Sequence, residues 1–167
     1  MDELTIAFAI SEAESLELDY LLWEVLWKPL GLPRDFRGSL NLDGECLELV
    51  VKADGRIVGG LVAHWMDDSE VEIRHIALEP EVQNQGVGRR VVTSLISTVS
   101  GQGCVRIQTI ARSTSVGFFR KLGFTISRGK PPEHSDFKKH GITFVLMERD
   151  VEQPGQGDPS KTAAPSG

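Results

Sequence analysis

The segment over residues 83–90, QNQGVGRR, combines two glycines with two adjacent arginines directly before a stretch with helical periodicity. Glycines let a loop turn sharply, so that successive main-chain N–H groups can point toward one position. The partial positive charge of a helix N-terminus and the arginine side chains would attract an anion there. The segment therefore predicts a pyrophosphate-binding loop, although a Gly-x-Gly sequence alone is more often a plain tight turn into a helix.

Two ionisable residues, Glu72 and His75, lie in the β-rich run before this loop. A carboxylate or an imidazole can accept a proton from a reacting group, and an unperturbed imidazole has a pKa of about 6.5. Side chains alternate along a regular strand, so Glu72 should share a face with Arg74 and Ile76, and His75 should point to the other. Two alternatives stay open: Glu72 only pairs with Arg74, and His75 is a core histidine unless a bulge reverses its side.

The elements that must position these residues follow from the spacing of apolar residues and turn formers. Strands are predicted over residues 5–10, 46–52, 56–66, 71–78, 104–110, 124–128 and 143–149. Helices are predicted from Ser11, which with Glu14 forms a capping-box pattern, to Pro29, and over residues 87–100 and 113–122.

The order of these elements predicts one α/β or α+β domain over residues 1–150. Strands 71–78 and 104–110 are joined by the helix 87–100, which is the pattern of a parallel βαβ crossover. Residues 151–167 are rich in Pro, Gly and Ser and lack periodic apolar positions, so they are expected to form a disordered C-terminal tail.

Length and composition exclude several classes of protein. The 167 residues, of which 40% are hydrophobic and 25% charged, suit one soluble globular domain. No apolar run reaches the roughly 18 to 20 residues needed to span a bilayer, and the acidic N-terminus is unlike a secretory signal, so a cytoplasmic location without a membrane is expected. The net charge of −6 argues against nucleic-acid binding. Cys46 and Cys104 lack zinc-site spacing, so no metal and two buried thiols are expected.

A third segment lies downstream: residues 115–124 read SVGFFRKLGF, a short helix closed by glycine. Together with IRHIALEP over residues 73–80 and the glycine loop, it resembles the signatures of the GCN5-related N-acetyltransferase (GNAT) superfamily. The resemblance extends over the order of elements in residues 5–149. It implies a three-layer fold in which a mixed, mostly antiparallel sheet of about seven strands is flanked by about four helices.

The resemblance further implies that the cosubstrate is acetyl-CoA. Main-chain N–H groups from Gln85 through Arg89 would hold the pyrophosphate, and the main chain of Ile76 to Leu78 would pair with the extended pantetheine arm. The residues implied to contact CoA are Ile76, Ala77, Leu78, Gln83, Asn84, Gln85, Gly86, Val87, Gly88, Arg89, Arg90, Arg112, Phe118, Phe119 and Lys121. Glu72 lies where similar acetyltransferases that modify histones carry a glutamate base, which makes it the first candidate and His75 the second.

The chain departs from the family pattern at the group that protonates the leaving thiolate. The family commonly uses a tyrosine of the short helix, and this chain has Phe119 at that position. Arg112 and Ser115 likewise stand where an asparagine and an alanine are common. A thiol has a pKa of about 8.5, so the CoA thiolate is an adequate leaving group even when no acid protonates it. Ser115, Tyr20 or a water molecule remain alternatives for this role.

The acceptor pocket is expected around the first helix, the loop after it and the loop 129–141. Acidic residues that would attract a cationic amine there are Glu17, Asp19, Glu24, Asp35 and Asp43. Trp23, Trp27 and Trp65 are candidates for its walls, although tryptophans are more often core residues.

The sequence thus favours an N-acetyltransferase that transfers an acetyl group from acetyl-CoA to a primary amine of a small molecule or peptide within a ternary complex. Because Phe119 replaces the usual acid, a non-catalytic acyl-CoA sensor is the alternative, and a nucleotide-binding domain unrelated to CoA is a third interpretation. The acceptor and the oligomeric state stay open, with a homodimer as one alternative.

Overall fold

The computed structural model describes residues 3–40 and 44–153, and its centre is one seven-stranded sheet. The strand order is β1-β2-β3-β4-β5-β7-β6. The strands are β1 (Leu4–Phe8), β2 (Cys46–Ala53), β3 (Arg56–Trp65), β4 (Glu70–Leu78), β5 (Arg106–Arg112), β6 (Thr125–Ile126) and β7 (Phe144–Asp150). All neighbouring strands are antiparallel except β4 and β5, which run parallel. The mixed, mostly antiparallel sheet and the βαβ crossover are as predicted.

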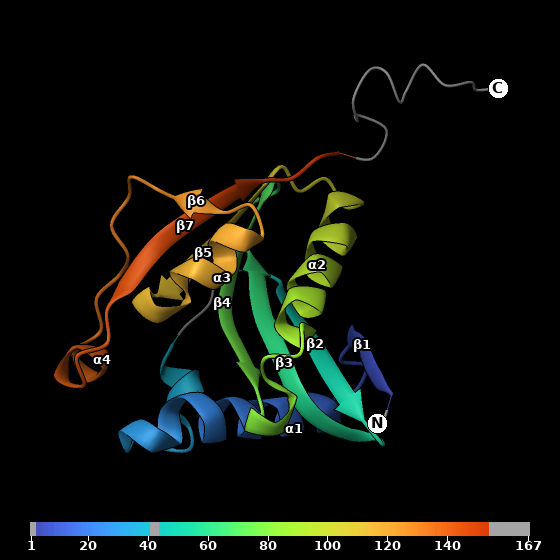
Figure 1. The fold of residues 1–167 in the computed structure, drawn as a ribbon, viewed down its shortest axis with the longest axis vertical. Helices are drawn as coiled ribbons and strands as arrows, with labels where there is room; N and C mark the ends of the chain where they lie inside the picture. The colour runs from blue at the N-terminus through green and yellow to red at the C-terminus, as the bar shows by residue number, and fades with distance from the viewer. Residues whose placement is uncertain (1–2, 41–43, 154–167) are drawn as a thin grey trace.

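Helices cover both faces of the sheet and make it the middle of three layers (Figure 1). The helices are α1 (Glu12–Leu22), the π-helix η1 (Trp23–Trp27), α2 (Val87–Ser100), α3 (Val116–Lys121) and α4 (Ser135–Lys139), with 3-10 turns at 28–30, 36–39, 80–82 and 113–115. One buried cluster joins the sheet to α2 and α3, and a second joins the opposite face to α1 and η1.

The sheet opens between β4 and β5, which diverge toward one end in Figure 1. Their parallel pairing runs only from Glu70 to Ile73 on β4. Arg74 is the extra residue of a bulge, because His75 pairs with Val62 of β3 while Ile73 pairs with the next residue along β3. Beyond that point β5 continues along β7 as far as Arg112. The divergence leaves one side of each strand free to line a cavity.

The first helix begins as predicted but ends earlier. The Glu14 N–H donates to the Ser11 hydroxyl at 3.2 Å, and the Glu14 carboxylate accepts the N–H of Ile10 at 3.0 Å, which is a capping box displaced by one residue. The regular α-helix stops at Leu22 rather than near Pro29. The last turn widens into the π-helix, with Lys28 N–H bonded to the Trp23 carbonyl, directly before a proline that has no N–H to donate.

Three further expectations need correction. The loop 129–141 contains the short helix α4, which His134 caps by accepting the Asp136 N–H. Cys104 is buried as predicted, but Cys46 is exposed. Val151, which falls in the predicted tail, is buried in the core, and its N–H bonds to the Val105 carbonyl at 2.9 Å. The rest of the predicted tail, residues 154–167, lies outside the described residues.

Candidate functional site

The glycine loop has the backbone conformation that an anion cradle requires. Asn84 and Gly86 both adopt positive φ angles, of 61° and 78°, which turn the chain between the 3-10 turn and α2. The first hydrogen bond at the start of α2 runs from Arg90 N–H to the Gly86 carbonyl at 3.2 Å. The N–H groups of residues 87–89 therefore have no acceptor within the helix. Amides of this kind, at a positive helix end, are suited to bind phosphate oxygens.

The two glycines of the loop serve different purposes. A Cβ on Gly86 would meet no atom within 4 Å, so this residue borders open space and needs glycine for its φ angle. A Cβ on Gly88 would lie 3.2 Å from the Phe118 ring of α3. Gly86 thus leaves room for a ligand, whereas Gly88 lets α2 and α3 pack closely.

Side chains hold the loop in place against the end of β4. Gln83 donates from Nε2 to the Leu78 carbonyl at 2.8 Å, and Gln85 donates to the Glu81 carbonyl at 2.8 Å. The Leu78 carbonyl, one of the main-chain groups predicted to pair with the pantetheine arm, already accepts this bond. Ala77 is buried in the cluster under α1, so only its main chain is available to a ligand.

A cavity of about 580 Å³ occupies the opening between β4 and β5. Its apolar and aromatic walls come from η1, β4, β5, α3, α4 and β7. Its polar and charged lining residues are Arg74, His75, Gln83, Thr109, Arg112, Thr114, Ser115, Glu133 and His134. A second, more open hollow of about 560 Å³ brings together Arg89 and Lys121, two residues predicted to contact CoA.

The bulge at Arg74 turns His75 into the cavity. Its ring meets Trp27 of η1 edge-on, with centroids 5.0 Å apart. Ile76 also borders the cavity but packs against the cluster on the opposite face of the sheet. The regular-strand prediction is therefore wrong beyond Arg74, and the reversal allowed for a bulge is the observed case. No described group hydrogen-bonds to the buried Nε2 of His75. Burial, followed by the charges of Arg74 and Arg37, lowers the pKa of His75 to about 3, so the ring is neutral at neutral pH.

Glu72 lies in a buried hydrogen-bond network beside the cavity. Its Oε1 is 2.9 Å from His64 Nε2 and accepts from Arg74 at 3.3 Å, and its Oε2 accepts from Gln108 at 2.5 Å. The side chain is 7% exposed and does not itself line the cavity. Arg74, which does, connects Glu72 to the cavity wall. The alternative in which Glu72 pairs with Arg74 is thus present, together with two further partners.

The short helix α3 places Ser115 and Phe119 on the cavity wall, one turn apart. Phe119 is 2% exposed and packs edge-on against Phe118 and Phe124, with ring centroids 5.0 and 5.3 Å away. Where the family has a phenol, this chain presents an apolar ring. The Ser115 hydroxyl is a polar group one turn before it, facing the same cavity.

These features agree with the comparisons with known proteins. The model of the acetyltransferase (GNAT) family matches residues 11–124, which is more than half of the chain. The chain belongs to this family. The GNAT motifs read from the sequence lie within the matched residues, and the predicted family is confirmed.

Solved structures of the GNAT family share the fold. The chain superposes on the ribosomal-protein-S18-alanine N-acetyltransferase of Escherichia coli with a TM-score of 0.68, at 16% identity and 90% and 96% coverage of the two chains. For Tetrahymena GCN5 the TM-score is 0.67, at 19% identity and 89% and 96% coverage. For a GNAT family acetyltransferase of Elizabethkingia anophelis with acetyl-CoA bound it is 0.65, at 18% identity and 90% and 100% coverage.

One curated relative matches a shorter region of this GNAT chain. It is serotonin N-acetyltransferase 2, chloroplastic, of Oryza sativa subsp. japonica, which is 37% identical over 51 residues, 30% of this chain. The match spans about a quarter of the relative, 26% of its length.

The acidic residues expected to attract an amine in this GNAT domain lie outside the cavity. Glu17 accepts the Ile57 N–H at 2.9 Å, Asp19 pairs with Arg34 at 2.6 Å, and neither lines the cavity. Glu24 and Asp35 are likewise absent from its lining, and Asp43 lies outside the described residues.

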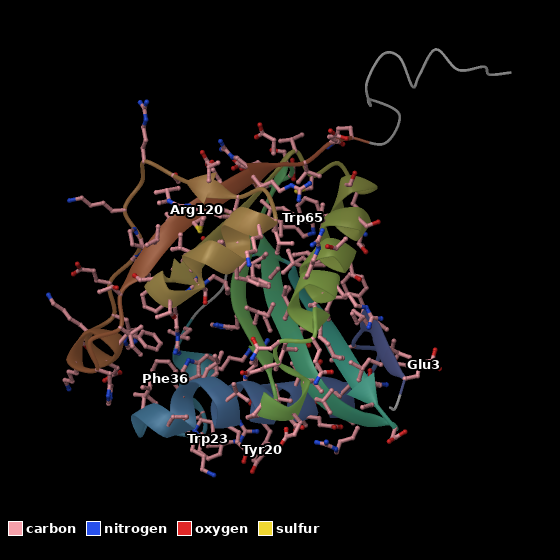
Figure 2. All side chains as sticks on the ribbon, viewed as in Figure 1. Glu3, Tyr20, Trp23, Phe36, Trp65 and Arg120 are labelled. Carbon is pink, nitrogen blue, oxygen red and sulfur yellow. The ribbon has the colours of Figure 1, made fainter. Side chains whose placement is uncertain are left out.

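Of the three tryptophans, only Trp27 lines the cavity. Figure 2 shows Trp23 beside Tyr20 at the outer edge of the first helix, and Trp65 near the opposite end of the sheet. Tyr20 is 46% exposed and is not a cavity residue either. The prediction that Trp23 and Trp65 form acceptor walls is therefore not supported by their positions.

Several cavity residues were missed in the sequence. Thr109 is 2% exposed and donates to the Ile73 carbonyl at 3.3 Å, and its place in an alternating strand was the available signal. His134 caps α4 and Phe137 lies within it, and the short, polar sequence of this helix has too few apolar positions to show helical periodicity.

Among the described residues there is no helix long and apolar enough to cross a membrane.

Proposed function

We propose that the protein transfers an acetyl group from acetyl-CoA to a primary amine of a small molecule or peptide. The observation that carries the proposal is the loop at Gly86, whose free amides and open space stand next to the cavity between β4 and β5. A cradle for two linked phosphates beside a hollow of this size fits a long cosubstrate that reaches from the surface to a buried reactive end. Acetyl-CoA supplies an activated acyl group as its thioester.

The chain's own residues bind and orient that cosubstrate. The amides from Gln85 to Arg89 hold the pyrophosphate, with Arg89 and Lys121 of the second hollow adding positive charge. The free side of β4 next to the bulge at Arg74 offers main-chain groups to an extended arm, as an added strand would. We assign to a main-chain N–H at the bulge the role of stabilising negative charge on the thioester oxygen.

The acceptor must attack as a neutral amine, so its proton has to leave. Its nitrogen forms the new bond to the carbonyl carbon as the carbon–sulfur bond breaks, and the amine proton passes to Glu72 through water. Glu72 is the candidate because its carboxylate lies directly behind the cavity wall, 3.3 Å from the wall residue Arg74. His75 contacts the same space, but with its low pKa it orients the amine rather than retaining a proton.

The departing thiolate needs a hydrogen-bond donor. Ser115, the N-cap residue of α3, lines the cavity one turn before Phe119, and we assign it this role. A serine hydroxyl is a weak acid, so Ser115 stabilises the thiolate by hydrogen bonding while water supplies the proton.

One observation favours a second candidate function, an acyl-CoA sensor that does not catalyse transfer. Phe119 is buried among other phenylalanines and provides no acid at the family's usual position.

Release of free CoA thiol from acetyl-CoA separates the two candidates. We expect release above the rate of hydrolysis with at least one member of a panel of amino acids, polyamines, aminoglycosides and peptides. Tight acetyl-CoA binding without transfer to any amine would favour the sensor. Binding of ATP or NAD in preference to acetyl-CoA in a titration would contradict both.

A further inference from the structure

Arg112 is a cation on the cavity wall that has no acidic partner among the described residues. It ends β5, paired with Phe144 of β7, and its Nη2 donates to the Leu26 carbonyl at 3.3 Å. Burial lowers the pKa of its guanidinium, and no neighbouring carboxylate acts in the opposite direction. Holding a charge partly out of water without a counter-charge is unfavourable unless a ligand supplies one.

Other arginines around the cavity are compensated. Arg74 contacts Glu72 at 3.3 Å, and Arg37 contacts Glu48 at 2.6 Å. Both pairs are built from residues of the chain itself. Arg112 lines the cavity as Arg74 does, but differs from both in having no ion pair with a carboxylate among the described residues.

Arg112 therefore adds to the cavity a positive charge that no carboxylate pairs with among the described residues. Its charge contributes to the lowered pKa of His75, together with those of the ion-paired Arg74 and Arg37. Glu133, an exposed residue, is the one carboxylate among the described lining residues. A ligand that is only cationic is disfavoured here, and a ligand with an anionic group is favoured.

Apolar residues form a large part of the wall that Arg112 belongs to. Leu26 and Val25 of η1, Leu40, Phe137 and Phe144 line the same cavity. A ligand that fills this space buries an apolar body while placing an anion at the guanidinium. A planar guanidinium suits a carboxylate because it donates two parallel hydrogen bonds.

We infer that Arg112 binds a carboxylate carried by the acyl acceptor, so that the acceptors are amines with a nearby carboxylate and an apolar body. The inference rests on the proposed function and names its substrate class. It also reassigns Arg112 from the CoA-contacting set to acceptor recognition.

Matched amines with and without a carboxylate test the inference. We expect kcat/KM for L-phenylalanine to exceed that for 2-phenylethylamine by at least about tenfold, and the same for L-leucine against 3-methylbutylamine. Arg112→Gln keeps a polar side chain with a hydrogen-bond donor but loses the charge. It should lower kcat/KM for the amino acids by about 10-fold to 100-fold, change that for the plain amines by less than about threefold, and leave the acetyl-CoA Kd unchanged.

The control is Arg128→Gln, which removes an exposed arginine outside the cavity and should change none of these values. Binding of each amine to the enzyme–CoA complex, measured by calorimetry, gives the same comparison without turnover.

Equal binding of both members of each pair, or equal losses of kcat/KM for both members in Arg112→Gln, would overturn the inference. A preference for succinyl-CoA over acetyl-CoA that Arg112→Gln removes would place the carboxylate on the donor instead. Failure of wild-type protein to bind acetyl-CoA would contradict the proposed function itself.

Discussion

Glu72 is the residue on which proton removal from the acceptor depends in the proposed mechanism. Glu72→Gln should lower kcat by about 10²-fold or more, most strongly below neutral pH where more of the amine is protonated, because general-base catalysis contributes about 10²–10⁴-fold. The measurement is the pH–rate profile together with acetyl-CoA affinity, which should stay within about twofold of wild type.

A matched control lies two residues earlier on the same strand. Glu70 is ion-paired with Arg106 at 2.6 Å and lies outside the cavity, so Glu70→Gln should retain the wild-type profile. If Glu72→Gln shows an unchanged profile as well, Glu72 has no part in the reaction and its network with His64 and Gln108 is structural.

At the scale of elements, the site depends on how closely α2 and α3 approach each other. An alanine Cβ at Gly88 would lie 3.2 Å from the Phe118 ring, so Gly88→Ala must shift this ring and loosen the contact between α2 and α3. We expect a loss of about 1–2 kcal/mol in the free energy of unfolding, measured by urea titration, and weaker acetyl-CoA binding.

Gly117 provides the comparison within α3 itself. No atom lies within 4 Å of a Cβ built there, and alanine is favoured over glycine inside a helix by roughly 0.5–1 kcal/mol. Gly117→Ala should therefore be neutral or stabilising. Equal stability changes in the two variants would show that the contact between Gly88 and Phe118 does not hold the helices in register.

The elements that the sequence predicts well are those with strong periodicity. The helix predicted over residues 87–100 is observed as Val87–Ser100, and the hairpin turn at Asp54–Gly55 joins β2 to β3 as expected. Apolar spacing and turn residues are local properties, so they can be read without the rest of the fold.

What could not be predicted depends on contacts between distant segments. The bulge at Arg74 arises from pairing with β3, and its consequence is that His75 rather than Ile76 meets Trp27. The lack of an acidic partner for Arg112 among the described residues could not be predicted either, because it depends on which carboxylates the fold brings close to this side chain. Both features bear on the proposed chemistry of the cavity, whereas the loop proposed to bind the cosubstrate could be predicted from its glycines.

For the whole molecule, His75 couples stability to pH. Its folded pKa of about 3 lies below the ordinary value of about 6.5, so between these values the unfolded chain binds a proton that the folded protein does not. The free energy of unfolding therefore falls as pH drops below 6.5, by up to about 1.4 kcal/mol per pH unit. Between pH 7 and pH 4.5, His75 alone lowers the free energy of unfolding by about 2–3 kcal/mol.

His75→Phe should remove this dependence, since phenylalanine fills similar space beside Trp27 and cannot titrate. In urea titrations, the free energy of unfolding of His75→Phe should fall between pH 7 and pH 4.5 by about 2 kcal/mol less than that of the wild type. His140→Gln, at an exposed histidine that ends α4, should follow the wild-type curve. A His75→Phe variant as acid-sensitive as wild type would show that His75 already binds a proton in the folded state.

The central claim is that the amides around Gly86 hold the pyrophosphate of acetyl-CoA, and titration of acetyl-CoA into two glycine variants tests it most directly. Gly86 and Gly103 have positive φ angles of 78° and 90°, and a Cβ on either would meet no atom within 4 Å, so valine strains both backbones alike. Gly103 lies at the opposite end of α2. We predict that Gly86→Val weakens binding at least about 100-fold while Gly103→Val leaves it within about threefold; equal affinities in the two variants would contradict the claim.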